Sequence, residues 1–361
     1  MNTKNKTQLL GKKRSEIEDY LDSMGESRFR GRQIHKWIYK KQCSSFFEMT
    51  DLPRELRQIL EDNARISIPR VLKQRVSSDG SRKFLLELDD KKRIETVLIP
   101  HSDEKDSKYT ICLSTQVGCP IACSFCATGL SGFQRNLDAY EIAGQLLGSQ
   151  RELAKRLKLP DSNNLISNVV YMGMGEPMLN YDEVIASIHI LNDPQGINMG
   201  QRNITISTAG EVKGIDLMAQ ENLQVTLAIS LHACDNELRS GLIPLNRKYP
   251  LEKLLPAIRN YIAKTNRRVT FEYIMLDNIN ISKRDAQNMV QLLKSLLANV
   301  NLIPYNEVEA LDFKRPSPQR IKQFYNWLIQ GGLNVSIREE RGGDISAACG
   351  QLSLEQQKGK K

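Results

Sequence analysis

The sequence predicts an α/β protein in which a small N-terminal helical domain precedes a partial (β/α)6 barrel. Beyond residue 109, short runs rich in Val, Ile and Thr alternate with longer segments of helical periodicity, a pattern typical of buried parallel strands joined by helices. Before residue 63, the apolar residues recur only at helical spacing. With 361 residues, 40% of them hydrophobic, the chain is long enough for two or three domains.

The N-terminal segment 1–75 is expected to be a helical, basic, RNA-binding domain. Helices are predicted over 15–24, 31–41 and 53–62, the last one beginning with a proline in its first turn. This segment contains 17 Lys/Arg and 10 Asp/Glu, a net charge of +7, whereas the rest of the chain contains 34 and 32, a net charge of +2. The excess of positive charge therefore belongs to one domain, where it can neutralise phosphates.

Within this domain, one stretch combines six basic residues with three aromatic ones and lacks acidic residues. The basic residues are expected on RNA phosphates, whereas aromatics at helical spacing, Trp37 above all, are expected in the core. The alternative is a solvated basic helix that binds nothing. The basic residues are Arg28, Arg30, Arg32, Lys36, Lys40 and Lys41, interleaved with Phe29, Trp37 and Tyr39.

The remaining elements follow from periodicity. Alternating β-branched residues over 83–100, around Asp89-Asp90, predict a hairpin within a connector, 76–108. The barrel domain, 109–345, is followed by a C-terminal segment, 346–361, that carries Cys349. Barrel strands are predicted over 110–114, 168–172, 203–207, 225–231, 269–275 and 300–303, with a seventh at 334–338, and helices over 138–157, 182–191, 251–263, 284–297 and 319–329.

The cysteine content and the hydropathy pattern indicate a cytoplasmic protein. Seven cysteines, an odd number with four of them between residues 112 and 126, fit a reducing compartment rather than a disulfide framework. Cys43 and Cys234 are expected to be ordinary structural thiols. The basic N-terminus lacks a signal-peptide pattern, and no apolar run approaches the length of a membrane span, so no membrane association is expected.

The strongest chemical signal is a group of three cysteines, Cys119, Cys123 and Cys126, spaced C-x3-C-x2-C. Three thiolates can hold a 4Fe-4S cluster and leave one iron open to another ligand. A structural zinc site normally takes four protein ligands, often as two separated pairs, and no second Cys/His pair lies nearby. The sequence therefore favours an iron–sulfur cluster, with zinc as the alternative.

This spacing resembles that of the radical S-adenosylmethionine (SAM) enzymes, and further motifs resemble their RlmN/Cfr family. Cys112, seven residues upstream of the motif, and Cys349, near the C-terminus, mark that branch. Six segments match in the same order along most of the chain: Arg-Ile-Glu-Thr-Val (93–97), Ser-Thr-Gln-Val-Gly-Cys (114–119), Gly-Phe-Gln-Arg-Asn-Leu (132–137), Met-Gly-Met-Gly-Glu-Pro (172–177), Ser-Leu-His (230–232) and Ala-Ala-Cys-Gly-Gln-Leu (347–352).

The resemblance implies an enzyme that methylates carbon 2 of adenine in 23S rRNA, at the peptidyl-transferase centre, and in tRNA, at the anticodon loop. It implies a radical mechanism through an S-methylcysteine, with a 4Fe-4S cluster and two SAM molecules per turnover. An electron donor such as flavodoxin or ferredoxin and a monomeric state are also expected.

Residue roles carry over from the family to the matching positions. Cys349 would accept the methyl group, Cys112 would resolve the adduct with RNA, and Glu95 would accept a proton. The SAM-contacting residues are expected near the ends of predicted strands, where active sites of such barrels lie. They are Gly175 and Glu176 at the amino group, Ser207 on the carboxylate side, and Ser230, Leu231, His232 and Asn306 at the ribose and adenine.

Alternatives remain for the activity and for one residue. A Cfr-type enzyme would methylate carbon 8 of adenine with the same cysteines. A non-catalytic RNA-binding protein with a structural metal would have no use for Cys112 and Cys349. The segment 101–108 is longer and more polar than the family pattern, and Glu95 has the alternative role of an exposed hairpin carboxylate paired with Arg93 or Lys92.

Overall fold

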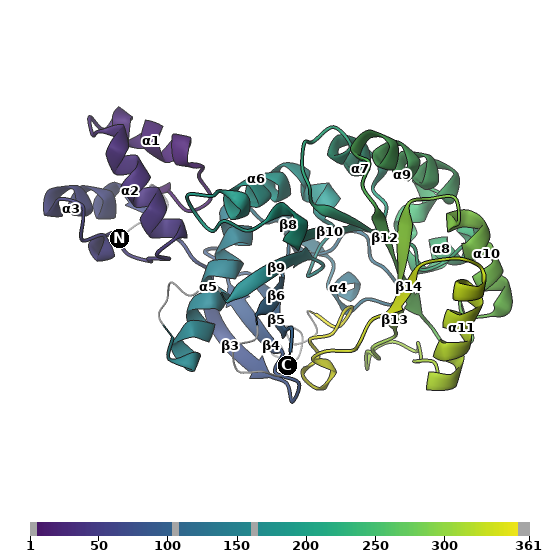
Figure 1. The fold of residues 1–361 in the computed structure, drawn as a ribbon. Coiled ribbons are helices and arrows are strands. Elements are labelled where there is room, and N and C mark those ends of the chain that lie inside the picture. The colour runs from purple at the N-terminus through teal and green to yellow at the C-terminus, as the bar shows by residue number, and fades with distance from the viewer. Residues whose placement is uncertain (1–5, 103–107, 160–164, 353–361) are drawn as a thin grey trace.

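A ten-stranded mixed sheet forms the centre of the molecule (Figure 1). The computed structural model describes residues 6–102, 108–159 and 165–352. The strand order is β14-β13-β12-β11-β10-β9-β6-β5-β4-β3. Most of the polar segment 101–108 and the end of the C-terminal segment, 353–361, lie outside the described residues.

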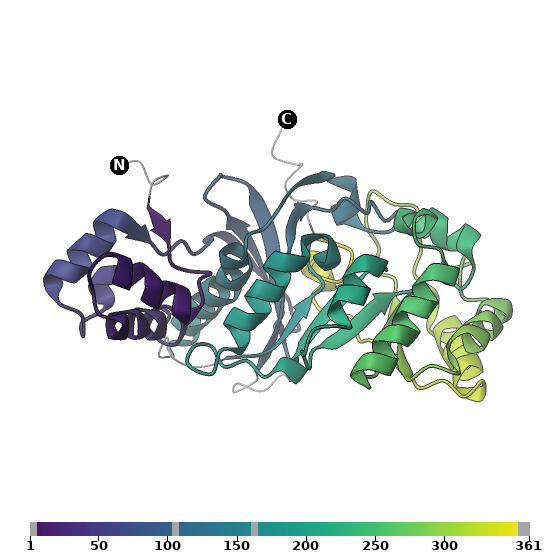
Figure 2. The same ribbon diagram turned by 90° about the horizontal axis from the view of Figure 1, so that it is seen from above.

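Seven parallel strands form the barrel part of the sheet, as the sequence predicts. Each pairs in parallel with its neighbour, and apolar side chains fill these strands because helices cover the outer side of the curved sheet (Figures 1 and 2). The α/β partial barrel is therefore confirmed. The strands are β6 (Tyr109–Cys112), β9 (Ile166–Tyr171), β10 (Ile204–Thr208), β11 (Thr226–Ser230), β12 (Val269–Met275), β13 (Ala298–Pro304) and β14 (Val335–Ile337).

The barrel helices agree with the five predicted ranges to within a few residues, except that α10 ends four residues early. They are α5 (Ala139–Leu157), α6 (Tyr181–Asn192), α9 (Leu251–Thr265), α10 (Lys283–Leu293) and α11 (Pro318–Gln330). Two seven-residue helices, α7 (Val212–Met218) and α8 (Asn236–Leu242), were not predicted because two turns are too short to show a clear period. Among the helices that the structure describes, none has the length and apolar content that a bilayer span requires.

The predicted hairpin extends this sheet. Its strands, β4 (Arg82–Glu87) and β5 (Arg93–Pro100), are antiparallel, and β5 also pairs antiparallel with β6. A further strand, β3 (Arg70–Val76), pairs with β4 at the sheet edge and was not predicted. Its exposed charged residues are typical of an edge strand and hide the strand pattern. The expected domain boundary at residue 75 thus falls near the end of a sheet strand.

A small hairpin carries the three-cysteine motif. Its strands are β7 (Gln116–Gly118) and β8 (Phe133–Asn136), with the short helix α4 (Ala127–Leu130) between them. Gly118 has a φ of +79°, and a Cβ atom there would lie 1.7 Å from the carbonyl oxygen of Gly132. Only glycine permits this close approach of the two strands.

The N-terminal domain consists of α1 (Arg14–Ser23), α2 (Arg28–Tyr39) and α3 (Arg54–Asn63), closed by the short parallel pair β1 (Thr7–Gln8) and β2 (Ala64–Arg65). Figure 1 shows it beside α5 and α6 at one end of the molecule. The hydroxyl of Tyr39 accepts from Gly11 N (2.8 Å) and donates to Lys12 O (2.9 Å), and His35 lies 3.3 Å from the Asp193 carboxylate, just after α6.

Candidate active site

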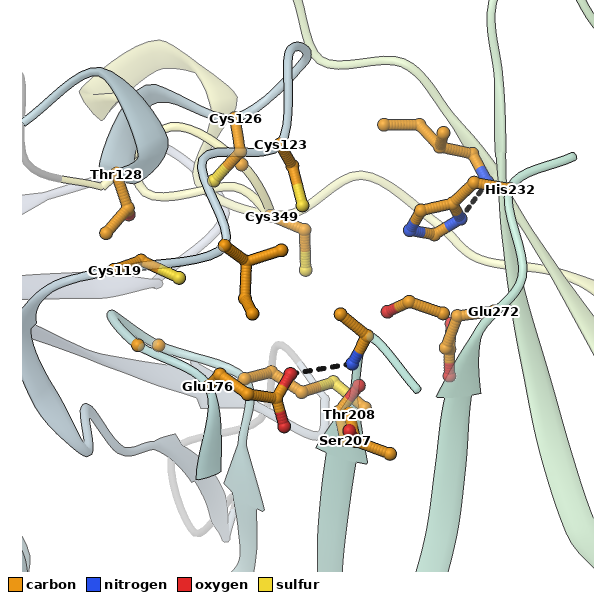
Figure 3. A pocket seen from close by; sticks show the side chains of 18 of the residues that line it. Cys119, Cys123, Cys126, Thr128, Glu176, Ser207, Thr208, His232, Glu272 and Cys349 are labelled. Atoms are coloured by element: carbon orange, nitrogen blue, oxygen red, sulfur yellow. Dashed lines mark hydrogen bonds between the residues drawn. The ribbon is translucent and has the colours of Figure 1, made fainter. Parts of the chain in front are cut away.

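A pocket opens at the carboxyl ends of the barrel strands. Figure 3 shows the cysteine loop and Cys349 facing Glu176, Ser207 and Thr208, with His232 and Glu272 beside them. Parallel strands bring their carboxyl ends to one edge of the sheet, so loops far apart in sequence converge there. Most of the expected site residues line this pocket: Cys119, Cys123, Cys126, Gly175, Glu176, Ser207, Ser230, His232 and Cys349.

The three cysteines of the motif share one half-buried loop. Its turn is fixed by Ala122, in the left-handed region with a φ of +54°, and by hydrogen bonds from Cys126 N to Cys123 O (3.2 Å) and from Ser124 N to Leu242 O (3.1 Å). The second bond ties the loop to the end of α8. The three thiols thus lie on one wall of the pocket (Figure 3).

The environment of these thiols fits a cluster whose inorganic core is cationic. Burial raises the pKa of Cys119 to about 12 and that of Cys123 well above its ordinary value, and neighbouring cysteines raise both further. Three thiolates here therefore need a positive centre to hold them. Among the described residues no three His, Cys, Asp or Glu side chains are grouped to hold a single metal ion. In a 4Fe-4S cluster each thiolate binds a different iron, so the three sulfurs need not converge on one metal ion.

Glu176 faces the cysteines across the pocket. The chain reaches it through Gly173, where a Cβ would lie 2.7 Å from Leu113 O, and Gly175, with a φ of +104°. The buried carboxylate accepts from Ala209 N (2.7 Å) and Met178 N (3.0 Å). Burial raises the pKa of Glu176 to about 7, although these hydrogen bonds lower it. Its charge therefore changes near neutral pH.

His232 is a neutral imidazole at the end of β11. Its Nδ1 accepts from Ile274 N (3.1 Å), and its backbone is in the left-handed region with a φ of +59°. Burial, followed by the charge of Arg239, lowers the pKa of His232 to about 3. The ring lines the pocket as a polar group without charge at physiological pH.

Two expected SAM residues lie elsewhere. Leu231 is completely buried in the main hydrophobic core, and its side chain does not line the pocket. Asn306 lines a second, adjoining cavity, where its Nδ2 donates to Cys349 O (3.2 Å) and its buried Oδ1 lacks a hydrogen-bond partner. Leu231 therefore supplies apolar packing, whereas Asn306 places an unsatisfied hydrogen-bond acceptor beside Cys349.

The second cavity brings the two outer cysteines together. Cys112, at the end of β6, and Cys349 both line it, and Cys349 also lines the first pocket. Burial raises the pKa of Cys112 to about 12, and the neighbouring Cys349 raises it further. Arg338, just after β14, lines both cavities, and its charge lowers the pKa of Cys112. Sequence analysis missed Arg338, although its place after a barrel strand was a usable signal.

Glu95 is not the exposed hairpin carboxylate of the alternative. It is completely buried and forms an ion pair with Lys83 Nζ at 3.3 Å. It lines neither cavity. Lys83, itself 3% exposed, also donates to Ser346 O at 3.1 Å. Glu95 therefore connects to the segment that carries Cys349 through Lys83.

The chain around Cys349 is clamped on two sides. Before Cys349, the β3–β4 turn binds the end of the barrel domain: Asp79 accepts from Gly342 N (2.7 Å), and Ser77 Oγ donates to Asp344 (2.5 Å). After Cys349, the cysteine loop binds the C-terminal segment through Ala127 N, which donates to Gly350 O (2.7 Å). Cys349 lies between these two attachments.

The basic stretch of the N-terminal domain is partly neutralised by α1. Arg28 pairs with Asp19 (2.7 Å), and Arg32 with Glu18 (3.3 Å). These acidic residues lie outside the acid-free stretch, so the sequence pattern did not reveal them. Lys36 and Lys40 are exposed.

The aromatic residues of this stretch do not all join the core. Trp37 packs against the core but is only half-buried, with Lys41 Nζ 3.3 Å from the centre of its ring. Phe29, in contrast, is 56% exposed. The domain thus presents an apolar ring beside its basic side chains.

Comparisons with known proteins agree with this geometry. Residues 7–66 match the ribosomal RNA large subunit methyltransferase N-terminal domain, and residues 113–290 match the radical SAM superfamily. The chain is 70% identical over 352 residues to the "Probable dual-specificity RNA methyltransferase RlmN" of Syntrophomonas wolfei, with 98% of each chain covered. It is 44% identical to the dual-specificity RNA methyltransferase RlmN of Halorhodospira halophila, covering 96% of this chain and 93% of the relative.

The chain belongs to the RlmN family. A crystal structure of a radical SAM methyltransferase from Sphaerobacter thermophilus is similar over 96% of this chain and 99% of that one, with a TM-score of 0.90 and 41% identity. Like other RlmN proteins, the chain is a radical SAM RNA methyltransferase. Membership of this superfamily implies SAM and an iron–sulfur cluster.

We expect the buried Lys83–Glu95 pair to be required for stability. Lys83→Met removes a cation that pairs with a completely buried carboxylate and should lower the free energy of unfolding by about 3–5 kcal/mol. Adding Glu95→Gln should recover much of this loss. Denaturant unfolding of both single variants and the double variant measures the coupling.

The matched control is Lys91→Met. Lys91 pairs with Glu87 at the same 3.3 Å but is exposed, so its loss should cost less than about 1 kcal/mol. A Lys83→Met variant as stable as this control would contradict the importance of the buried pair.

Proposed function

We propose that this enzyme methylates carbon 2 of adenine in 23S rRNA and tRNA through an S-methyl group on Cys349. One observation carries the proposal: Cys349 shares one cavity with the three cysteines of the motif and the other with Cys112. A methyl carrier needs access to SAM, to the substrate base and to a resolving thiol. Because it lies between the two cavities, Cys349 can reach both the three cysteines of the motif and Cys112.

The first pocket would hold both cofactors. Cys119, Cys123 and Cys126 would bind the 4Fe-4S cluster, which supplies the electron for reductive cleavage of SAM. The anionic form of Glu176 suits the amino group of SAM, and neutral His232 suits its adenine or ribose. The remaining SAM contacts in this pocket are assigned to Gly175, Ser207 and Ser230, while contacts from the Leu231 backbone and from Asn306, which lines the adjoining cavity, stay predictions.

The outer cysteines would divide the reaction. The Cys349 thiolate attacks the methyl carbon of one SAM molecule, and the sulfonium leaves as the neutral thioether. Arg338, whose charge interacts with Cys349, lines both cavities beside this thiol. A second SAM would be consumed to remove one hydrogen atom from the S-methyl group, whose carbon then bonds to adenine; the adduct loses the C2 proton and returns one electron to the cluster. The Cys112 thiolate would then attack the Cys349 sulfur and form a disulfide, while the sulfur–carbon bond breaks and the released carbon takes up a proton to give the methylated base.

Two supporting roles remain predictions. A flavodoxin- or ferredoxin-type donor would supply electrons. Glu95 was expected to accept a proton, but its pairing with Lys83 supports a part in holding the Cys349 segment at least as well. The monomeric state also stays a prediction.

Nucleoside analysis tests the proposal. Unmodified 23S rRNA and tRNA are incubated with anaerobically reconstituted enzyme, SAM and reductant, then digested for mass spectrometry. We expect 2-methyladenosine from both RNAs. 8-Methyladenosine would indicate the Cfr-type reaction, and the absence of any methylated adenosine would overturn the proposal.

Variants of Cys349 and Cys112 should stop the methylation reaction at different stages. Cys349→Ala should neither acquire a methyl group nor become linked to RNA, because it lacks the carrier sulfur. Cys112→Ala should accept the methyl group, bond to adenine and stall, because no thiol can attack the Cys349 sulfur. Mass spectrometry of the C-terminal peptide should then show a nucleotide adduct that thiol reductants do not remove.

Cys43→Ala is the matched control. Cys43 is a buried thiol of the N-terminal domain, away from both cavities, so this variant should turn over normally. An unmodified C-terminal peptide in Cys112→Ala, or normal turnover by that variant, would show that Cys112 does not resolve the adduct.

The affinity for SAM should fall as the pH falls through about 7. Glu176 is ionised above this pKa and neutral below it, and only the ionised form attracts the ammonium group of SAM. Between pH 8 and pH 6 the dissociation constant should rise roughly fivefold to tenfold. Equilibrium binding to the cluster-loaded enzyme measures this change. Glu176→Gln should bind weakly with a flat profile; a variant with the wild-type slope would contradict the assignment.

The exposed lysines of α2 should contribute to RNA affinity through phosphates. Replacing Lys36 and Lys40 with glutamine should reduce the log–log salt slope of RNA binding by up to about 0.7–0.9 per lost contact. Arg28→Gln is the control, since Asp19 already neutralises that side chain and a smaller change is expected. Equal slopes for wild type and the double variant would mean that this face is merely solvated.

A further inference from the structure

The most deeply buried charge beside the pocket belongs to Arg239, on α8, whose side chain is 0% exposed. Its Nε donates to Leu231 O (3.1 Å), and its Nη2 donates to Ala209 O (2.8 Å) and Ser230 O (2.9 Å). Its Nη1 donates to Asn246 Oδ1 (2.7 Å). These bonds fix the chain just beyond β10 and at the end of β11, where the pocket begins.

All of these acceptors are neutral. Within the ranges that the structure describes, no carboxylate forms an ion pair with Arg239, and the anionic forms of Cys123 and Cys234 are the groups whose charge stabilises it. Burial lowers the pKa of Arg239 to about 10, so it stays charged at neutral pH. A buried charge is costly without a counter-charge. An anion close to Arg239 would therefore stabilise this buried charge.

The cysteine loop can supply that anion. Cys123 interacts electrostatically with Arg239, and α8 is attached to the loop through the hydrogen bond from Ser124 N to Leu242 O (3.1 Å). Leu238 and Leu242, on either side of Arg239 in the helix, belong to the apolar cluster that surrounds the three cysteines. Cys234 is a poor counter-charge, because burial and nearby carboxylates raise its pKa and keep it a thiol.

We infer that Arg239 is the counter-charge of the iron–sulfur cluster and raises its reduction potential. The inference rests on the ligand assignment of the proposed function. A 4Fe-4S cluster with three thiolates is anionic, and one electron from the donor adds another negative charge. A nearby cation in a poorly solvated site stabilises the reduced form more than the oxidised form. Arg239 does not line the pocket, so it is a positioning residue rather than a catalytic one.

The test must distinguish the effect of the charge of Arg239 from the effect of its hydrogen bonds to the strand ends. Arg239→Lys keeps the charge but loses most of the bonds, whereas Arg239→Gln loses the charge. Both variants are reconstituted anaerobically, without RNA, and titrated electrochemically with detection of the reduced cluster by electron paramagnetic resonance. Arg267→Gln is the matched control, since Arg267 donates to Val225 O (3.1 Å) just before the opposite end of β11.

At a fixed potential, Arg239→Gln should reduce the ratio of reduced to oxidised cluster at least tenfold, equivalent to about 59 mV for one electron. Arg239→Lys and Arg267→Gln should stay within about threefold of wild type. Equal shifts in the Lys and Gln variants, or no shift in either, would overturn the inference.

If Arg239→Gln does not bind a cluster, a second variant and the iron content of the purified proteins test the inference instead. Asn246→Asp keeps Arg239 and places a carboxylate at the 2.7 Å contact, so it should lower the same ratio; an unchanged ratio counts against the inference. Loss of iron from folded Arg239→Gln but not from Arg239→Lys supports the inference. Equal loss from both variants would mean that Arg239 acts only through its hydrogen bonds, which overturns it. These readouts need no RNA, so they stand or fall separately from adenine methylation.

Discussion

The clamp on the C-terminal segment is the contact on which the arrangement of thiols depends. Cys349 follows the last strand of the sheet and has no regular secondary structure to position it. The β3–β4 turn and Lys83 hold the chain before it, and the cysteine loop holds the chain after it. The antiparallel extension of the barrel thus serves to position a residue far away in sequence. Without it, the two cavities would not share a thiol.

Burial controls the electrostatics of the site. It raises the pKa of the thiols of Cys112, Cys119, Cys123 and Cys126 and of Glu176, and it lowers that of His232, so these groups are neutral in the absence of charged ligands. The cations nearby are fixed beforehand: Arg338 lies beside the outer cysteines, and Arg239 lies behind the cysteine loop. A site that binds an anionic cluster and a charged cofactor benefits from such preorganised charges, because they need not reorganise during the reaction.

The N-terminal domain shows why charge counted along the sequence overstates charge available to a ligand. Six basic residues fall in an acid-free stretch, yet α1 folds back so that Glu18 and Asp19 neutralise part of them. The exposed lysines and the exposed ring of Phe29 are the part of this stretch that we propose for contacts with RNA. The sequence pattern indicated which domain is basic, whereas the packing of α1 against α2 determines which basic side chains keep an unneutralised charge.

The sequence by itself determined the partial barrel, because the apolar runs of buried parallel strands and the periodicity of amphipathic helices are patterns that each segment carries alone. It also determined the cysteine motif, whose three thiols lie within eight residues of one another. The short helices and the edge strand were missed because local patterns there are weak. Only the tertiary structure decided that Lys83 pairs with Glu95, that Arg338 joins the two cavities, and that Arg239 lies behind the cysteine loop. Such contacts join separate elements of the chain, and their partners are selected by packing and by the need to satisfy buried polar groups, which local sequence does not encode.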